Sequence, residues 1–223
     1  MKINIDFRLL DVALELSALE DYLETIERQI DHIRKSEKLL LDAAIRKQNL
    51  NADDPEWHEV LDPYEHRIEF LLPRFFRCPF LVSLYAVYET AVTEIARLIQ
   101  KSQGQAIALS DIRGADFLDQ AKKYYKHILH FELCDDNAEW QQIIMLSQIR
   151  NAIAHTNGRI EMLRKKARDR IRNWEKKKIG MKSQWGYIIV DAAFVRKMFS
   201  SVQVSLLRLV DRYKQWDSST KSA

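Results

Sequence analysis

Residues 9–44, LLDVALELSALEDYLETIERQIDHIRKSEKLLLDAA, decide the fold class of this chain. Apolar residues recur through the stretch at alternating intervals of three and four, and only Glu37 interrupts the series. Such a repeat, of about 3.5 residues, is typical of a helix that packs along a nearly parallel partner helix. The stripe consists of Leu9, Val12, Leu16, Leu19, Leu23, Ile26, Ile30, Ile33, Leu40 and Ala44. We expect one long helix over residues 8–48. Its partner is either the next helix folded back, which we favour, or another subunit.

Length and composition favour a single helical domain. The chain has 223 residues, and its five glycines all lie after residue 103. Leu, Glu, Lys, Arg and Ala, which all favour helix, are abundant before that point. Antiparallel helices joined by short loops form an up-and-down bundle. We therefore expect an all-α, up-and-down helical bundle in one domain, residues 1–216, followed by a polar and frayed tail, residues 217–223.

The turn-forming residues predict where the helices begin and end. Residues 51–55, NADDP, end the first helix and cap a second one. Prolines at 63, 73 and 79 predict that the second helix is kinked or interrupted. Further helices are expected over residues 80–101, 113–130 and 137–154 and from Asp191 onward, with a short β-hairpin near residues 179–190.

Several classes of site are disfavoured. Cys78 and Cys134 have no metal-ligand spacing and form no disulfide framework. His127 and His130 are three residues apart, but no cysteine or further histidine supports a metal site. No apolar stretch approaches the roughly 20 residues that cross a bilayer, and residues 1–8 are charged where a signal peptide would be apolar. We expect a cytoplasmic protein without a cofactor, a metal ion or a membrane partner.

A second stretch, residues 147–158, SQIRNAIAHTNG, carries the candidate chemistry. It is the end of an amphipathic helix, and its last two residues tolerate the left-handed conformation that stops a helix. Asn151 and His155 are four residues apart and share a helix face, next to Arg150. A guanidinium binds phosphate bidentately, an imidazole transfers protons near neutral pH, and an amide can fix the imidazole tautomer. Taken alone, the same residues also fit an ordinary helix end.

The motif resembles that of the HEPN domains (higher eukaryotes and prokaryotes nucleotide-binding). Residues 81–90, LVSLYAVYET, resemble the early core helix of such domains, and residues 111–118, DIRGADFL, resemble the opening of the next helix. The resemblance covers residues 70–213. It implies a metal-independent endoribonuclease of toxin or phage-defence type. It also implies a homodimer in which two motifs face a shared cleft, and a possible antitoxin or defence-system partner.

The resemblance also implies a role for each candidate catalytic residue. His155 would act as general base or acid while the 2′-hydroxyl of RNA attacks the adjacent phosphorus. Arg150 would neutralise charge on the phosphoryl oxygens, and Asn151 would orient the imidazole or contact phosphate. In members paired with a nucleotidyltransferase antitoxin, a tyrosine follows two residues after the histidine. Here that residue is Asn157, which argues against regulation by that route.

A basic segment follows the motif directly. Residues 159–182 hold eleven Lys and Arg against three Asp and Glu, a net charge of +8 in a chain of net charge +3. This concentration predicts a contact surface for the RNA backbone, although a solvated helix face fits equally well. Trp174 and Trp185 would stack on bases or anchor the helix. The candidate RNA-binding residues are Lys165, Lys166, Arg168, Arg172, Lys176 and Lys177.

Glu89 is the one carboxylate in an otherwise apolar part of its helix. Because an unpaired buried carboxylate is costly, we expect either an ion pair with Arg150 or a position at a solvated rim. Two other functions remain open. The chain is alternatively a non-catalytic helical module that binds RNA or nucleotide or forms a dimer interface, or a coiled-coil scaffold built on the first helix.

Overall fold

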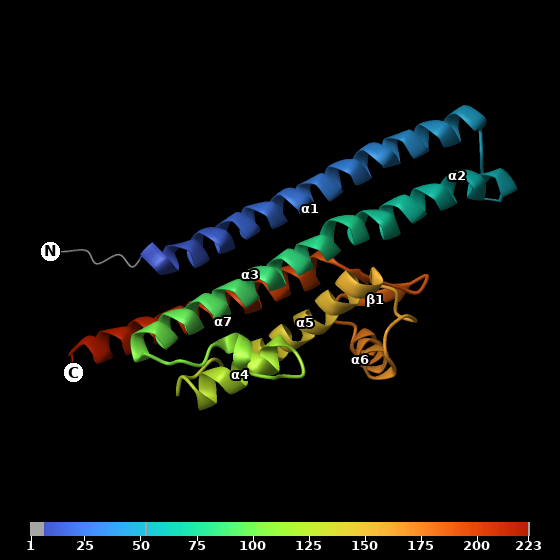
Figure 1. Cartoon of the computed structure of the whole chain (residues 1–223). Coiled ribbons are helices and arrows are strands. Elements are labelled where there is room, and N and C mark those ends of the chain that lie inside the picture. The colour runs from blue at the N-terminus through green and yellow to red at the C-terminus, as the bar shows by residue number, and fades with distance from the viewer. Residues whose placement is uncertain (1–6, 52, 223) are drawn as a thin grey trace. The chain divides into compact units, whose positions relative to one another are not determined.

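The computed structural model describes residues 7–51 and 53–222, and it confirms the all-α fold, the long first helix and the short hairpin. Figure 1 shows how the helices follow one another. The helices are α1 (Phe7–Gln48), α2 (Pro55–Glu65), α3 (Leu72–Gln103), α4 (Phe117–His127), α5 (Ala138–Thr156), α6 (Lys165–Lys176) and α7 (Ala192–Ser222). A π-helical segment, η1 (His66–Leu71), joins α2 to α3, and a 3₁₀ turn, η2 (Leu109–Asp111), precedes α4. Strands β1 (Met181–Gln184) and β2 (Tyr187–Val190) pair antiparallel.

The chain divides into two compact units, and each draws on separate segments of the sequence. Unit 1 comprises Met1–Leu19, Ser83–Gln148 and Lys197–Ala223, and unit 2 comprises Glu20–Val82 and Ile149–Arg196. Helices α1, α3, α5 and α7 therefore contribute residues to both units. Each unit is therefore assembled from segments that are far apart in the sequence. That residues 1–216 form a single domain stays a prediction.

The apolar stripe of α1 is buried as far as Ile30. In unit 2 this helix packs against α3, where the rings of Tyr22 and Phe80 lie 6.0 Å apart between centroids. The partner of α1 in that unit is thus a helix of the same chain, as we favoured. Beyond Ile30 the stripe opens to solvent, and Leu39 and Leu40 are 67% and 63% exposed.

The proline-rich stretch is irregular, as the sequence predicted, but it stays helical through the π-helical segment η1. Pro55 occupies the first turn of α2, where its missing N–H costs nothing, and Asp54 precedes it as the N-cap residue. Pro63 lies inside α2, and the π-helical turn follows it. Helix α3 follows η1 directly and begins at Leu72 rather than near residue 80, and Pro79 lies inside it.

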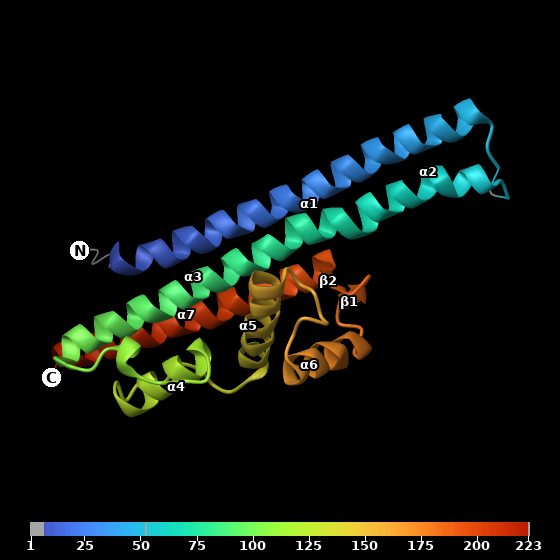
Figure 2. The ribbon, with the colours of Figure 1, turned by 45° about the vertical axis from the view of Figure 1, so that its right-hand side comes forward.

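Unit 1 has a core rich in tyrosine. Tyr85 and Tyr88 stack with ring centroids 6.3 Å apart, and the hydroxyl of Tyr125 donates to the carbonyl of Val92 at 2.6 Å. Helix α4 begins at Phe117 because the carboxylate of Asp116 accepts a hydrogen bond from the first turn. Figure 2 shows α4 and the loops around it from a second side.

The predicted frayed tail is helical instead. Helix α7 continues to Ser222, with no glycine or proline after Asp191 to stop it. The hydroxyl of Ser218 donates to the carbonyl of Lys214, and the hydroxyl of Thr220 donates to that of Trp216. These bonds satisfy both hydroxyls within the helix and are compatible with its continuation. Of the predicted tail, only Ala223 lies outside the described residues.

Unit 2 is held by a buried ion pair between α1 and α3. The Arg77 Nε donates to Glu27 Oε1 at 2.8 Å, and its Nη2 donates to Glu27 Oε2 at 2.7 Å. Its Nη1 donates to the carbonyl oxygen of Val190, at the end of β2, at 3.3 Å. One guanidinium therefore ties α1, α3 and the hairpin together.

Among residues 7–51 and 53–222, one helical segment is apolar enough, by length and composition, to cross a membrane. It lies within the continuous helical run Pro55–Gln103, has a mean hydropathy of 1.4, and is 50% buried inside the protein. We expected no stretch of this kind. Core helices of globular proteins have the same composition where they are buried on most sides. The charged start of the chain lies mainly outside the described residues, which begin at Phe7.

Candidate functional site

The end of α5 has the geometry that the motif predicted. The helix stops at Thr156, and Asn157 and Gly158 follow with φ angles of 52° and 76°. The amide of Gly158 donates to the carbonyl of Ala152 at 3.1 Å, and the hydroxyl of Thr156 donates to the same carbonyl at 2.7 Å. The left-handed conformation of Asn157 and Gly158 brings the Gly158 amide within reach of this carbonyl and ends the helix.

Arg150 and Asn151 are in direct contact. The half-buried guanidinium of Arg150 donates through Nη1 to Asn151 Oδ1 at 2.9 Å. His155 lies in the last turn of the helix and is exposed. On an ideal helix Arg150 and His155 point about 140° apart, whereas Asn151 and His155 are only about 40° apart. The hydrogen bond therefore draws the guanidinium toward the face that Asn151 shares with His155.

Glu89 lies on α3 in unit 1 and is half-buried. Arg150 belongs to unit 2. The predicted ion pair between them stays a prediction.

Two arginines outside the set of candidate RNA-binding residues lie beside the end of α5, and one of them, Arg159, is the first cation of the basic segment. Arg74 of α3 donates through Nη2 to the carbonyl of Asn157 at 3.3 Å, and its Cζ lies 4.0 Å from the ring centroid of Tyr187. Arg159 donates through Nε to the Tyr187 hydroxyl at 2.6 Å. That bond, more than any other contact, raises the pKa of Arg159. The hairpin brings Tyr187 here because residue 159 forms a β-bridge with it.

Aromatic side chains continue from Tyr187 along the hairpin. The ring centroid of Trp185 lies 4.7 Å from that of His66 and 4.8 Å from that of Phe70. Trp185 is nevertheless 60% exposed, and Phe75, whose ring centroid lies 5.2 Å from Cζ of Arg74, is 59% exposed. Of these residues only Trp185 was expected from the sequence, because the others lie on η1 and α3, far from the motif in the chain.

The basic segment, residues 159–182, forms α6 and reaches the first two residues of β1. Ile171 is buried and Trp174 is half-buried, so Trp174 packs partly against the protein. Of the six predicted RNA-binding residues, Arg168 is half-buried and the other five are exposed. A shallow hollow of about 570 Å³ lies along α6 and is lined by Lys165, Lys166, Asp169, Arg170 and Asn173. The helix thus presents cations to solvent.

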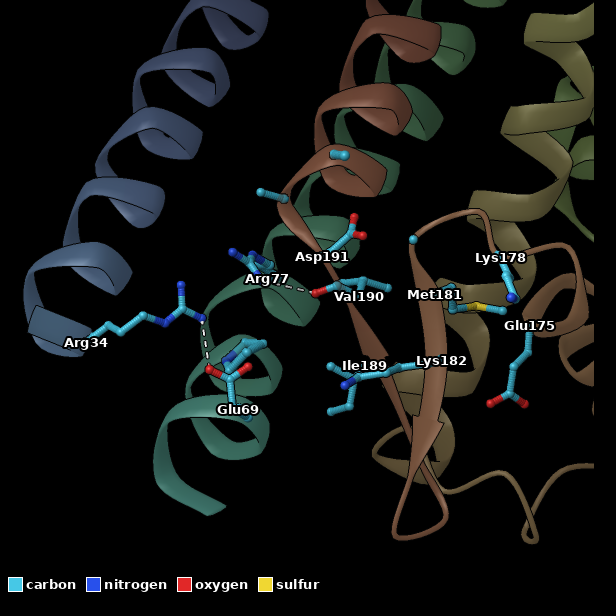
Figure 3. A pocket seen from close by; sticks show the side chains of 14 residues that line it. Arg34, Glu69, Arg77, Glu175, Lys178, Met181, Lys182, Ile189, Val190 and Asp191 are labelled. Atoms are coloured by element: carbon cyan, nitrogen blue, oxygen red, sulfur yellow. Dashed lines mark hydrogen bonds and ion pairs between the residues drawn. The ribbon is translucent and has the colours of Figure 1, made fainter. Parts of the chain in front are cut away.

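A larger cavity, of about 710 Å³, lies elsewhere in unit 2, and Figure 3 shows the residues around it. Its charged lining carries both signs. Arg34 Nη2 lies 3.5 Å from Glu69 Oε1, and Lys178, Lys182 and Glu175 also line the cavity. Glu175 in turn accepts hydrogen bonds from the amide and hydroxyl of Ser183, each at 2.7 Å. None of the motif residues lines this cavity.

Within residues 7–51 and 53–222, no group of three or more His, Cys, Asp and Glu is arranged to hold a metal ion. His127 and His130 are exposed in unit 1. Comparison of the chain with protein-family models, with curated proteins and with solved structures found no match.

Proposed function

We propose that this protein is a metal-independent endoribonuclease of the HEPN type. The observation that carries the proposal is the hydrogen bond from Arg150 to Asn151, one helical turn before the exposed His155. It directs a fixed cation toward the face that presents a proton-transfer group. Cation and imidazole at one exposed helix end are the groups that phosphodiester cleavage requires.

In the proposed reaction the 2′-hydroxyl of RNA supplies the nucleophile. As its oxygen bonds to phosphorus, a base takes the hydroxyl proton, and the bond from phosphorus to the 5′-oxygen breaks. An acid returns a proton to that leaving oxygen, so that the products are a 2′,3′-cyclic phosphate and a 5′-hydroxyl. His155 serves as one of these two groups, and Arg150 stabilises the charge on the phosphoryl oxygens. DNA, which lacks the 2′-hydroxyl, would not be cut.

Asn151 has a defined part in this scheme. Because its Oδ1 accepts from Arg150, its amide N–H groups are the ones that can donate to a phosphate oxygen or to the imidazole. One histidine cannot be base and acid at once. A homodimer in which two motifs face one RNA strand would supply the second group, and an antitoxin or other defence-system protein would restrain it.

The decisive experiment incubates the purified protein with a structured RNA in the presence of EDTA. We expect cleavage by the wild type and none by His155→Ala or Arg150→Ala. The matched control is His127→Ala, which removes another exposed histidine from the end of a helix, α4. Circular dichroism and melting temperature check that each variant folds. Equal cleavage by all four proteins, or inhibition by EDTA, would overturn the proposal.

A second candidate is a non-catalytic module that binds RNA. The exposed cations of α6 favour it, since they need no catalytic group beside them to attract phosphate. A protein that binds RNA without cutting it, and whose binding is unchanged by His155→Ala, would be such a module. Replacing Lys165, Lys166 and Lys176 together by Ala should then weaken binding and flatten its dependence on salt.

A further inference from the structure

Beside the end of α5, unit 2 carries a platform of aromatic rings and guanidinium groups. We define the aromatic–arginine platform as His66, Arg74, Phe75, Arg159, Trp185 and Tyr187. The carbonyl of Asn157, two residues after His155, accepts a hydrogen bond from Arg74, so the platform begins at the motif. Main-chain bonds fix this proximity: Ile188 donates to the carbonyl of Gly158 and Ile160 donates to that of Gly186, both at 2.9 Å.

Core packing does not account for the exposed rings. Trp185 is 60% exposed although two rings contact it, and Phe75 is 59% exposed beside the guanidinium of Arg74. Trp185 also adopts a φ angle of 49° in the hairpin turn, a conformation that large side chains rarely adopt. His66 and Phe70 contact its ring and so limit its motion. A large ring held still and left open to solvent is a surface on which another flat group can stack.

The cations of the platform are available to an anion. Within the described part of the chain, neither Arg74 nor Arg159 forms an ion pair with a carboxylate. Each is positioned instead by the Tyr187 ring, with Cζ 4.0 Å and 5.2 Å from its centroid. Glu161 is the acidic group nearest to the hairpin turn, where a Cβ on Gly186 would lie 2.9 Å from its Oε2. Glu161 also interacts electrostatically with Arg159 without forming an ion pair with it, so the two guanidiniums outnumber this carboxylate and the platform stays positive.

We propose that the aromatic–arginine platform binds unpaired nucleotides of an RNA strand and leads that strand to His155. This inference rests on the proposed ribonuclease function and names its substrate as single-stranded RNA. Trp185 and Phe75 stack on bases, and Arg74 and Arg159 contact the phosphates between them. A single strand offers bases for the aromatic rings to stack on and phosphates for the guanidinium groups to contact. A duplex would not fit, because its bases hide their faces in the stack.

The test measures binding rather than cleavage, with His155→Ala as the parent so that the RNA stays intact. The probe is a fluorescent, unstructured uridine-rich RNA of about 12 nucleotides, which exceeds the smallest single-strand sites. We expect Trp185→Ala and Phe75→Ala each to weaken its binding about tenfold, the effect of losing one stacked base. Trp185→Phe should keep most of the affinity, because it keeps a ring. Leu39→Ala, which truncates an equally exposed apolar side chain on α1, should change nothing.

A duplex RNA of the same length separates this proposal from general attraction to phosphate. We expect the parent to bind it more weakly than the single strand, and Trp185→Ala to leave its affinity unchanged. The proposal would be overturned if Trp185→Ala lost equal affinity for both probes, or lost no affinity for the single strand. If the wild type cuts RNA while the platform variants bind and cut as it does, the platform fails and the nuclease stands. If single-strand binding depends on the platform but the wild type cuts no RNA, the nuclease fails and the platform stands.

Discussion

The guanidinium of Arg150 donates to the amide oxygen of Asn151, its immediate neighbour on α5, at 2.9 Å. Adjacent residues on a helix point about 100° apart, so this contact bends a long side chain around the helix surface. The amide thereby selects the side of the helix on which the cation acts. That side is the one that carries His155.

Asn151→Ala should remove one hydrogen bond of Arg150, loosen the position of its guanidinium and slow RNA cleavage. A hydrogen bond to a charged group is worth about 1.5–3 kcal/mol, which corresponds to a loss in kcat of about 10- to 100-fold. KM should change little, because the exposed cations that attract RNA are untouched. Steady-state kinetics on a short RNA checks the split between the two constants. Gln141→Ala, which removes an exposed amide earlier on the same helix, should retain full activity, and an equal loss there would contradict the assignment.

Removing one partner of the buried Glu27–Arg77 pair should strongly destabilise the protein. Glu27→Ala leaves a buried guanidinium without its carboxylate, and such changes cost about 3–5 kcal/mol. Urea unfolding measures the change in free energy. The control is Arg97→Ala, which breaks an exposed pair with Glu94 and should cost less than about 1 kcal/mol. If the two variants are equally stable, the pair does not hold unit 2 together.

Stability should fall at alkaline pH, in part because of Cys78. Burial raises the pKa of this thiol from 9.0 to about 12. Between these values the unfolded chain loses the proton and the folded chain keeps it, so the free energy of unfolding decreases as the pH rises. The expected loss from this group is roughly 1 kcal/mol for each pH unit above 9. Burial also raises the pKa values of Tyr88 and Tyr125, which adds to the fall above their ordinary value of 10.0.

Urea unfolding between pH 7.5 and 10.5, in reducing buffer, checks this dependence. Cys78→Ala should be less stable than the wild type at pH 7.5 because it removes a buried side chain, but its stability should fall less steeply above pH 9. A slope identical to that of the wild type would show that the thiol does not contribute.

Gly180→Ala should destabilise the start of α7. Gly180 has a φ angle of 88°, and a Cβ there would lie 2.5 Å from Oδ1 of Asp191. That oxygen accepts a hydrogen bond from the amide of Phe194 at 2.8 Å and caps the helix. Backbone strain and the disturbed cap together should cost about 2–3 kcal/mol.

The matched control for this substitution is Gly104→Ala. Gly104 has a φ angle of 66°, but a Cβ at this position would meet no neighbouring group within 4 Å, so only the backbone cost of about 1–2 kcal/mol remains. Melting temperatures of the two variants give the comparison. If both substitutions lower the melting temperature equally, Asp191 moves away from the new Cβ at position 180 without a loss of stability.

Local sequence signals predicted the elements well where the signal lies in neighbouring residues. The stripe of α1, the proline at the start of α2 and the stop at Asn157 are each encoded within a few turns of chain. The tail was the exception. Polar residues suggested fraying, yet residues 217–222 continue α7 because nothing in them breaks a helix. Polar side chains in this tail show that it is exposed to solvent, but they do not end the helix.

The candidate site was predicted in part, because some of its residues are near neighbours in the sequence. Arg150, Asn151 and His155 are close in the sequence, so helical geometry alone placed Asn151 and His155 on one face. The direction of the Arg150 side chain required the structure, since a flexible side chain has several rotamers and its contacts, among them the hydrogen bond to Asn151, choose among them.

By itself, the sequence determined the all-α class, the extent of the first helix, the hairpin and the position of the motif at a helix end, because periodicity and capping act between near neighbours. Only the tertiary structure decided that Arg77 pairs with Glu27, and that Arg74 and Tyr187 lie beside Asn157. These contacts join residues far apart in the chain. Their formation depends on how helices and hairpin pack within unit 2, and no local pattern of residues encodes that packing.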